Sequence, residues 1–384
     1  MRKASQPFFF YFFIVFIFVS LVGCTKQLDT KAIKNTPPDL SNIALINEVW
    51  YENDQQYIHP SFTYAGTGFL IDTKQGVLAA TAKHVLMIAN PKGMKGVSPN
   101  AHLEKWIMHP KNNKTDSVVI GQLLNEDKEE VLGFDKASIQ LRDWIVFATK
   151  YHSPNIKALT PRFTPLKVGE AIYFTGCPYK SEDCIIETAT VLGVKGNRII
   201  FSQENKGVNI GGASGSPLID AEGKLVGVLS GTSVSPKDGQ DALFGISTHY
   251  LEKILRGDKD LNKPVVAIKD FLNTSIAKIG VEKTIQQYKD LKKQSNFYFN
   301  YFVSPEGING VADQLLKTGK VEDGLKILAL SEKEHGFFSN TYTLLGKAYL
   351  AKKESASARK ALTEALRLWP ENEAAQELMG ALDK

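Results

Sequence analysis

Short apolar runs, each bounded by turn residues, fill this chain from about residue 43 to about residue 255. Representative runs span residues 66–71, 77–82, 144–148 and 171–176, and residues 220–224 have the composition of a hairpin turn. Such runs, bounded by glycine, proline, asparagine and aspartate, are typical of β-strands. Because no helical segments separate them, the pattern predicts a sandwich or a barrel and not a parallel sheet with crossover helices.

Four motifs stand in order within this β-rich region, at residues 66–71, 81–85, 142–146 and 211–218. Three of them carry His84, Asp143 and Ser214, which supply a base, a carboxylate that orients the base, and a nucleophile for acyl transfer. The turn around Ser214 is rich in glycine. We expect the N–H groups of Gly212 and Ser214 to point at one spot, where they would hold an oxyanion.

The residues offer two alternatives to this interpretation. Asp135 is a rival for the orienting carboxylate, because it lies in a glycine-containing loop just before Asp143. A nucleophile elbow of the Gly-x-Ser-x-Gly type would need glycine at position 216, where this chain has serine. It would also place the serine first in the order of the triad, so the elbow is excluded.

Residues 212–217 read Gly-Ala-Ser-Gly-Ser-Pro and resemble the Gly-x-Ser-Gly-x-Pro signature of trypsin-like serine proteases. The Thr-Ala-x-His turn at 81–84 and the apolar segment after Asp143 are similar to the same family, although Trp144 and Ile145 depart from its usual residues.

The resemblance covers residues 43–255 and implies a protease domain built as a double β-barrel. It implies that Ser214 forms an acyl-enzyme, with His84 as base, which water then hydrolyses. Ala213 stands where digestive members of the family have an aspartate that pairs with a freshly cut N-terminus. Since alanine cannot form that pair, we expect an enzyme that needs no activation cleavage.

The resemblance also points to the residues that would line the specificity pocket. Val208 occupies the position at which trypsin has an aspartate, and Ser230 and Gly231 belong to the expected pocket wall. Because none of these residues is acidic, we expect cleavage after apolar or small residues and not after lysine or arginine.

The N-terminal residues have the pattern of a signal peptide. Arg2 and Lys3 precede an uninterrupted apolar run from residue 8 to residue 22. A run of this length is short for a bilayer span and suits the apolar core of a signal peptide. An uncleaved membrane anchor is the alternative.

Residues 21–24 read Leu-Val-Gly-Cys and resemble the lipobox of bacterial lipoproteins. The resemblance implies that residues 1–23 are removed and that Cys24 is lipidated, with palmitate among the acyl groups expected. Residues 24–42 would form a tether. Thr25 follows where an aspartate often retains lipoproteins at the inner membrane, so we expect a lipid anchor in the bacterial cell envelope, at the outer membrane facing the periplasm.

The net charge and the cysteine content limit the kinds of ligand and cross-link that we expect. The formal net charge is +5, and loss of the leader lowers it by two. This excess is too small to indicate nucleic-acid binding, and no basic stripe alternates with aromatic residues. Cys177 and Cys184 flank a polar turn, which in an oxidising compartment predicts a disulfide, with two free thiols as the alternative. No metal and no cofactor is predicted.

The pattern changes after residue 255. Residues 256–276 carry several charges and are expected to form a linker, and from 277 to 384 apolar residues recur at helical spacing. A frame of about 34 residues starting at Ser339 matches the tetratricopeptide repeat, and a weaker copy precedes it. The matching residues are Tyr342, Leu345, Gly346, Tyr349, Ala358, Leu362, Ala365 and Pro370. An ordinary helical bundle is the alternative.

The sequence therefore predicts a multidomain β + α chain, in which a trypsin-like double β-barrel precedes an array of helical hairpins. The expected function is that of a membrane-tethered extracytoplasmic serine endopeptidase whose repeats recruit a protein partner or substrate. A non-catalytic scaffold that uses the barrels and repeats for binding is the alternative. An esterase acting through the same site is a third hypothesis.

Overall fold

The computed structural model describes residues 38–51, 54–89, 96–98 and 103–382. The expected signal peptide, Cys24 and most of the expected tether lie outside these residues. Pro37–Lys384 forms one compact unit. In the described part of the chain, no helix combines the length and the apolar character that crossing a membrane requires.

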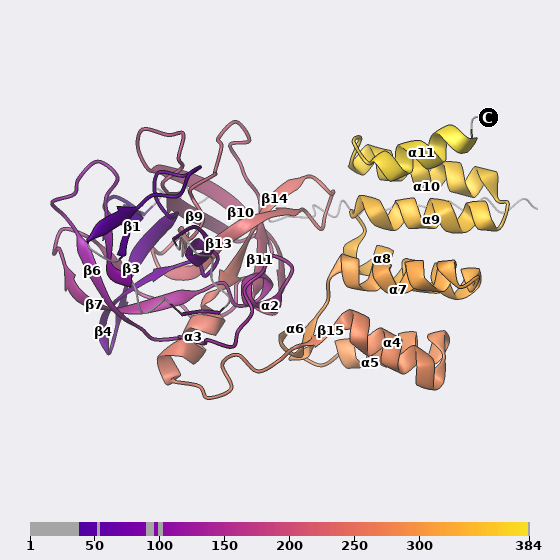
Figure 1. Ribbon diagram of the computed structural model, residues 1–384, viewed down its shortest axis with the longest axis horizontal. Helices are drawn as coiled ribbons and strands as arrows, with labels where there is room; N and C mark the ends of the chain where they lie inside the picture. Colours follow the sequence, from indigo (N-terminus) through magenta and orange to yellow (C-terminus); the bar gives the residue numbers. More distant parts are fainter. Residues whose placement is uncertain (1–37, 52–53, 90–95, 99–102, 383–384) are drawn as a thin grey trace, which may run out of the picture. The chain divides into compact units, whose positions relative to one another are not determined.

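Six antiparallel strands close into a first barrel in the order β1-β5-β6-β7-β4-β3, and pairing of Leu45 with Gly68 joins β3 back to β1 (Figure 1). The short strands β2 (Gln55–Tyr57) and β8 (Ala158–Leu159) extend this sheet. The six barrel strands are β1 (Leu45–Tyr51), β3 (Thr67–Thr73), β4 (Gly76–Thr81), β5 (Leu103–His109), β6 (Val118–Leu123) and β7 (Ile145–His152).

A second closed barrel follows in the order β10-β11-β14-β13-β12-β9. Its first strand along the chain pairs with its fourth and its third with its sixth, which is the connectivity of the first barrel. The strands are β9 (Ala171–Gly176), β10 (Ile185–Lys195), β11 (Arg198–Phe201), β12 (Pro217–Asp220), β13 (Leu225–Val234) and β14 (Asp241–Ser247). The predicted double β-barrel followed by helices is confirmed.

The apolar runs that predict the strands also form the cores. Five consecutive residues of β3, from Thr67 to Ile71, are buried, because both faces of this strand are covered. Phe69 belongs to the core of the first barrel, and Phe174 and Phe201 belong to that of the second. The helix α3 (Thr248–Arg256) packs Tyr250 against the first-barrel core. Two short helices, α1 (Val85–Ala89) and α2 (Ala137–Gln140), lie in the loops of the first barrel.

Helices make up the chain from residue 268 onward, apart from short connections (Figure 1). The first of them, α4, begins at Ile268, inside the segment expected to be a linker. The reason is that Ile268 and Leu272 are buried in the core of the helical region, and this packing extends the helix toward the N-terminus. The remaining elements are β15 (Val266–Ala267), α4 (Ile268–Ile279), α5 (Val281–Lys292), α6 (Phe297–Asn300), β16 (Tyr301–Phe302), α7 (Pro305–Lys317), α8 (Val321–His335), α9 (Ser339–Ala351), α10 (Ser355–Leu368) and α11 (Glu373–Leu382).

Small residues bring α9 and α10 close together. A Cβ atom on Gly346 would lie 2.6 Å from Cγ of Leu362, and Ala358 is fully buried. The helix α10 ends just before Pro370, since proline cannot donate the next helical hydrogen bond. At the start of α7, the Ser304 hydroxyl accepts from the N–H of Gly307 and caps the helix.

Candidate active site

His84 and Asp143 lie in contact. His84 is in the turn between β4 and α1, and Asp143 is in the turn before β7. His84 Nδ1 is 2.6 Å from Asp143 Oδ2, and the His84 main-chain N–H donates to Asp143 Oδ1 over 2.9 Å. Their exposed fractions are 3% and 0%. This two-point contact fixes the plane of the imidazole and leaves Nε2 on the opposite side of the ring.

Asp135, the alternative candidate for the orienting carboxylate, lies on the surface. The Asp135 side chain is 76% exposed and pairs with Lys136 on the surface. Of the two aspartates, the structure therefore brings Asp143 to His84.

Trp144 and Asn125 hold the segment that carries Asp143. The Trp144 indole N–H donates over 3.0 Å to the carbonyl of Ile246, which belongs to β14 of the second barrel. The Asn125 amide donates to the Trp144 carbonyl and accepts from the N–H of Val146. Trp144, which departs from the usual family residue, thus ties the Asp143 turn to both barrels.

The turn that carries Ser214 packs directly against the first barrel. The Thr67 N–H donates to the Ser214 carbonyl over 2.7 Å. A Cβ atom on Gly215, whose φ is +87°, would lie 2.2 Å from both Thr67 O and Thr81 Oγ1. Only glycine permits this approach. Because Thr81 ends β4 just before His84, the contact brings the Ser214 turn against the His84 turn.

Ser214 is partly exposed. Among the described residues it forms no hydrogen bond with His84. Bonds between a nucleophile and its base are often long in the absence of substrate and tighten when substrate binds.

The backbone around Gly212 offers unpaired donors. Gly212 has φ +102°, and the following N–H, that of Ala213, donates to the carbonyl of Ile210. Within the described part of the chain, neither the Gly212 N–H nor the Ser214 N–H donates a hydrogen bond. Two free N–H groups flanking a serine in a tight turn match what an oxyanion hole requires.

Thr67, on β3 of the first barrel, supports the turn that carries Ser214. Its hydroxyl donates to the Gly212 carbonyl over 2.9 Å and accepts from the Cys177 N–H over 2.9 Å. Thr67 is fully buried, so both groups would lack a partner without it.

A disulfide joins Cys177 to Cys184 and closes the loop after β9. The N–H of Tyr179 in this loop donates over 2.8 Å to the carbonyl of Gly211. The loop therefore supports the glycine-rich turn from the side of the second barrel.

The expected pocket residues lie in two segments. Val208, between β11 and β12, is partly buried, and its carbonyl accepts from the Gln203 amide. Ser230 and Gly231 lie on β13. The Ser230 hydroxyl is buried and has no hydrogen-bond partner among the described residues.

The barrel region is similar to known proteins. Residues 66–228 match the family model of the trypsin-like peptidase domain. The positions of His84, Asp143 and Ser214 lie within this range. A similar solved structure, that of a Glu endopeptidase in complex with MPD, is 15% identical, with a TM-score of 0.39. That similarity covers 57% of this chain and 90% of the other. No curated protein sequence gives a significant match.

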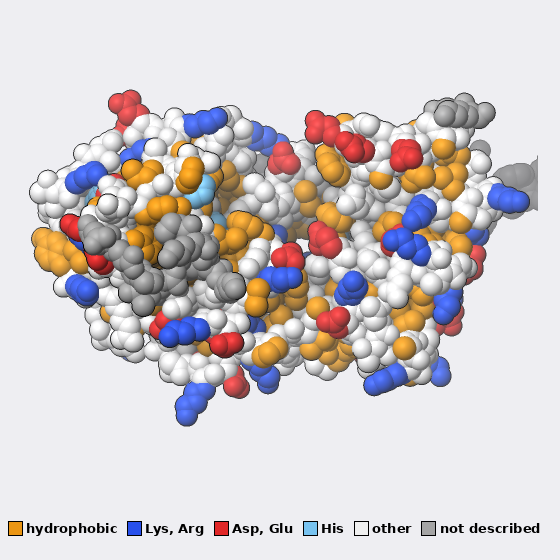
Figure 2. Space-filling view, in the orientation of Figure 1, with side chains coloured by type: hydrophobic (Ala, Val, Ile, Leu, Met, Phe, Trp, Pro, Cys, Tyr) orange, Lys and Arg blue, Asp and Glu red, His pale blue; other side chains and the backbone are white. Residues whose placement is uncertain are grey.

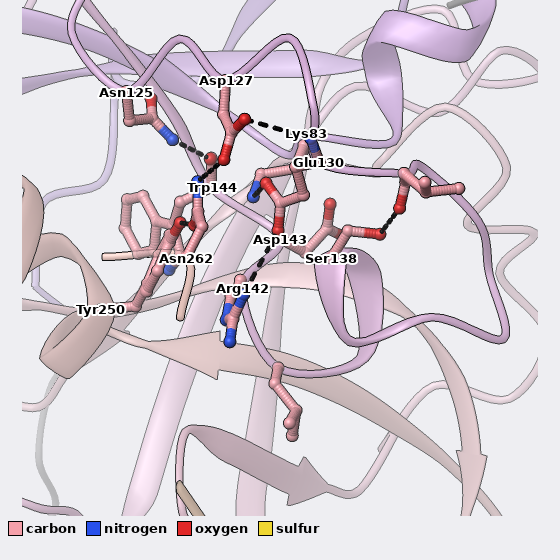
Figure 3. A network of polar contacts seen from close by, with 12 residues as sticks. Lys83, Asn125, Asp127, Glu130, Ser138, Arg142, Asp143, Trp144, Tyr250 and Asn262 are labelled. Atoms are coloured by element: carbon pink, nitrogen blue, oxygen red, sulfur yellow. Dashed lines mark hydrogen bonds and ion pairs between the residues drawn. The ribbon is translucent and has the colours of Figure 1, made fainter. Parts of the chain in front are cut away.

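Sequence reasoning missed several polar residues whose side chains are enclosed in the barrel region, and three of them lie near the candidate site. They are Thr67, Lys83 and Glu130, the last two paired as shown in Figure 3. Thr67 lies in the motif at residues 66–71, and Lys83 lies in the motif at residues 81–85. Their place in these motifs is the one sequence feature that could have identified them. Lysine is almost never fully buried unless it is paired, so no sequence feature predicted a buried position for Lys83.

The surface of the barrel region carries a cluster of hydrophobic side chains. On the face drawn in Figure 2, hydrophobic side chains gather around a histidine on the barrels, while acidic and basic side chains are interspersed elsewhere.

In the part of the chain that the structure describes, no three or more His, Cys, Asp or Glu side chains are grouped to hold a metal ion.

A Thr67→Val variant tests whether the two hydrogen bonds of the Thr67 hydroxyl support the turn that carries Ser214. Thr67→Val keeps the shape but leaves the Cys177 N–H and the Gly212 carbonyl unpaired, and we expect the free energy of unfolding in urea to fall by about 1–3 kcal/mol. Thr149→Val is the matched control, because its hydroxyl makes one partly buried bond, to Val77 O. Equal losses for the two variants would contradict the proposed role.

Proposed function

We propose that this chain is a serine endopeptidase that hydrolyses peptide bonds through an acyl-enzyme on Ser214. The observation that carries the proposal is the two-point contact between His84 and Asp143 beside a serine turn with two free N–H groups. The match of residues 66–228 to the trypsin-like peptidase domain supports it.

Each residue then has one role. His84 Nε2 takes the proton of the Ser214 hydroxyl as Oγ attacks the scissile carbonyl, and Asp143 holds the imidazole in the tautomer that can accept it. The N–H groups of Gly212 and Ser214 stabilise the oxyanion. His84 returns the proton to the leaving amine, and water repeats the sequence on the acyl-enzyme.

The site is proposed to work without an activation cleavage. Ala213 is fully buried and packs in the core of the second barrel. Its carbonyl accepts from the N–H and the hydroxyl of Ser216. The turn is thus held by its own hydrogen bonds, with no need for a new N-terminus.

A fluorophosphonate probe tests the triad. We expect the full chain in detergent to be labelled, and Ser214→Ala and His84→Ala to remain unlabelled. Asp143→Asn is expected to slow labelling by about 10⁴-fold, because the tautomer of His84 is then wrong. Asp135→Asn is the matched control and should react within twofold of the parent.

Other outcomes would select a different function. Absence of labelling in the parent would contradict the peptidase proposal and favour a scaffold. Labelling with turnover of small esters but not of peptides would favour an esterase.

We also propose a preference for apolar or small residues before the scissile bond, because Val208, Ser230 and Gly231 put no charge into the expected pocket. Profiling with a peptide library tests this. Cleavage after lysine or arginine at rates equal to those after alanine or valine would overturn it.

We also propose an envelope location, because residues 21–24 resemble a lipobox. Lipidation at Cys24 would hold the peptidase domain at a membrane, and the helical region would recruit a protein partner or substrate as tetratricopeptide repeats do. We expect Cys24→Ser to move the protein from the membrane fraction to the soluble fraction, while the fluorophosphonate rate of the solubilised enzyme stays unchanged. Retention of the variant on membranes would contradict a lipid anchor.

A further inference from the structure

Lys83 is a buried cation beside the candidate base. It precedes His84 in the chain, and its side chain has no exposed surface. Its ammonium lies 2.7 Å from Glu130 Oε2 and 5.2 Å from the centroid of the Tyr250 ring. Burial lowers the pKa of Lys83, while Glu130 and then Asp143 oppose this by favouring the charged form. None of the mechanistic steps above uses this residue.

Glu130 is held through its main chain and faces a second cation (Figure 3). The N–H of Glu130 donates to Asp127 Oδ1, and Asp127 Oδ2 accepts from the Asn262 amide over 2.7 Å. Glu130 Oε1 faces the Arg142 guanidinium at 3.7 Å and accepts no hydrogen bond among the described residues. Glu130 therefore lies between the cation that precedes His84 and the cation that precedes Asp143.

The same loop reaches the imidazole. Phe134 follows Glu130 by a few residues, and its ring centroid is 5.6 Å from that of His84. Within the described residues, Lys83 is tied to this loop by its one ion pair, with Glu130. The ion pair thus joins the turn of His84 to the loop that packs on its ring.

We propose that Lys83 is a positioning residue for the triad. Through Glu130 it fixes the His84 turn relative to Asp143 and holds the Phe134 loop against the imidazole. The inference rests on the proposed peptidase function. It differs from a role in stability alone, because misplacing a catalytic group by about 1 Å can cost about 10²-fold in rate without unfolding the protein.

The test variant removes both charges together. Lys83→Met alone would leave the enclosed Glu130 carboxylate with only the Arg142 guanidinium at 3.7 Å. Breaking a buried ion pair by removing one partner is strongly destabilising, whereas loss of both charges is often neutral. We therefore choose Lys83→Met with Glu130→Gln in the full chain. Lys292→Met with Glu334→Gln is the matched control, since it removes a Lys–Glu pair in the helical region.

Inactivation by a fluorophosphonate, followed at several probe concentrations, separates binding (KI) from the chemical step (kinact). We expect the Lys83 double variant to unfold within a few degrees of the parent, with kinact lowered about 10- to 100-fold and KI changed less than threefold. The control pair should leave both constants unchanged. A kinact within twofold of the parent in the folded Lys83 double variant would overturn the proposal.

A second readout does not depend on activity. The proton shared by His84 and Asp143 should give a far-downfield ¹H NMR signal in the parent. We expect that signal to shift or broaden in the Lys83 double variant and to persist in the control. If the parent shows the signal but no labelling, the peptidase proposal fails while this test still stands. An unchanged signal in the Lys83 double variant would overturn the positioning role.

Discussion

The close approach of the Ser214 turn to β3 and β4 is the contact on which the candidate site depends. Gly215 lies where any side chain would collide with Thr67 and Thr81. One barrel carries the candidate nucleophile, and the other carries the candidate base and its carboxylate. Their chemistry requires that the two turns meet, and a missing Cβ atom makes that meeting sterically possible.

Polar groups that are not needed for the chemistry hold each turn in place. Thr67 binds the Gly212 carbonyl, and the loop closed by the Cys177–Cys184 disulfide supports the neighbouring residue. Trp144 bonds across to β14. Loss of the Thr67 hydroxyl would leave the buried Gly212 carbonyl and Cys177 N–H unpaired, which costs more than the net value of the bonds. Such supports keep a catalytic geometry fixed where substrate is absent.

Much of the fold was predictable because its signals are local. Apolar runs bounded by turn residues predicted strands, and the helical spacing of apolar residues from 277 to 384 predicted helices, which the structure has. The start of α4 was not predictable, because charges around Ile268 mask a helix that only packing against the helical core stabilises. The buried Lys83–Glu130 pair could not be predicted for a similar reason. The two residues are far apart in the sequence, and each residue type alone is typical of a protein surface.

The sequence by itself determined the class of the chain, the order of its motifs and the identity of His84, Asp143 and Ser214 as candidates. Chemistry restricts those roles to few residue types, and glycine marks the backbone turns. The tertiary structure decided which aspartate contacts His84 and which polar residues support the glycine-rich turn. It also decided that a lysine is enclosed beside the candidate base. Those facts depend on contacts between distant segments, and closure of the barrels creates these contacts.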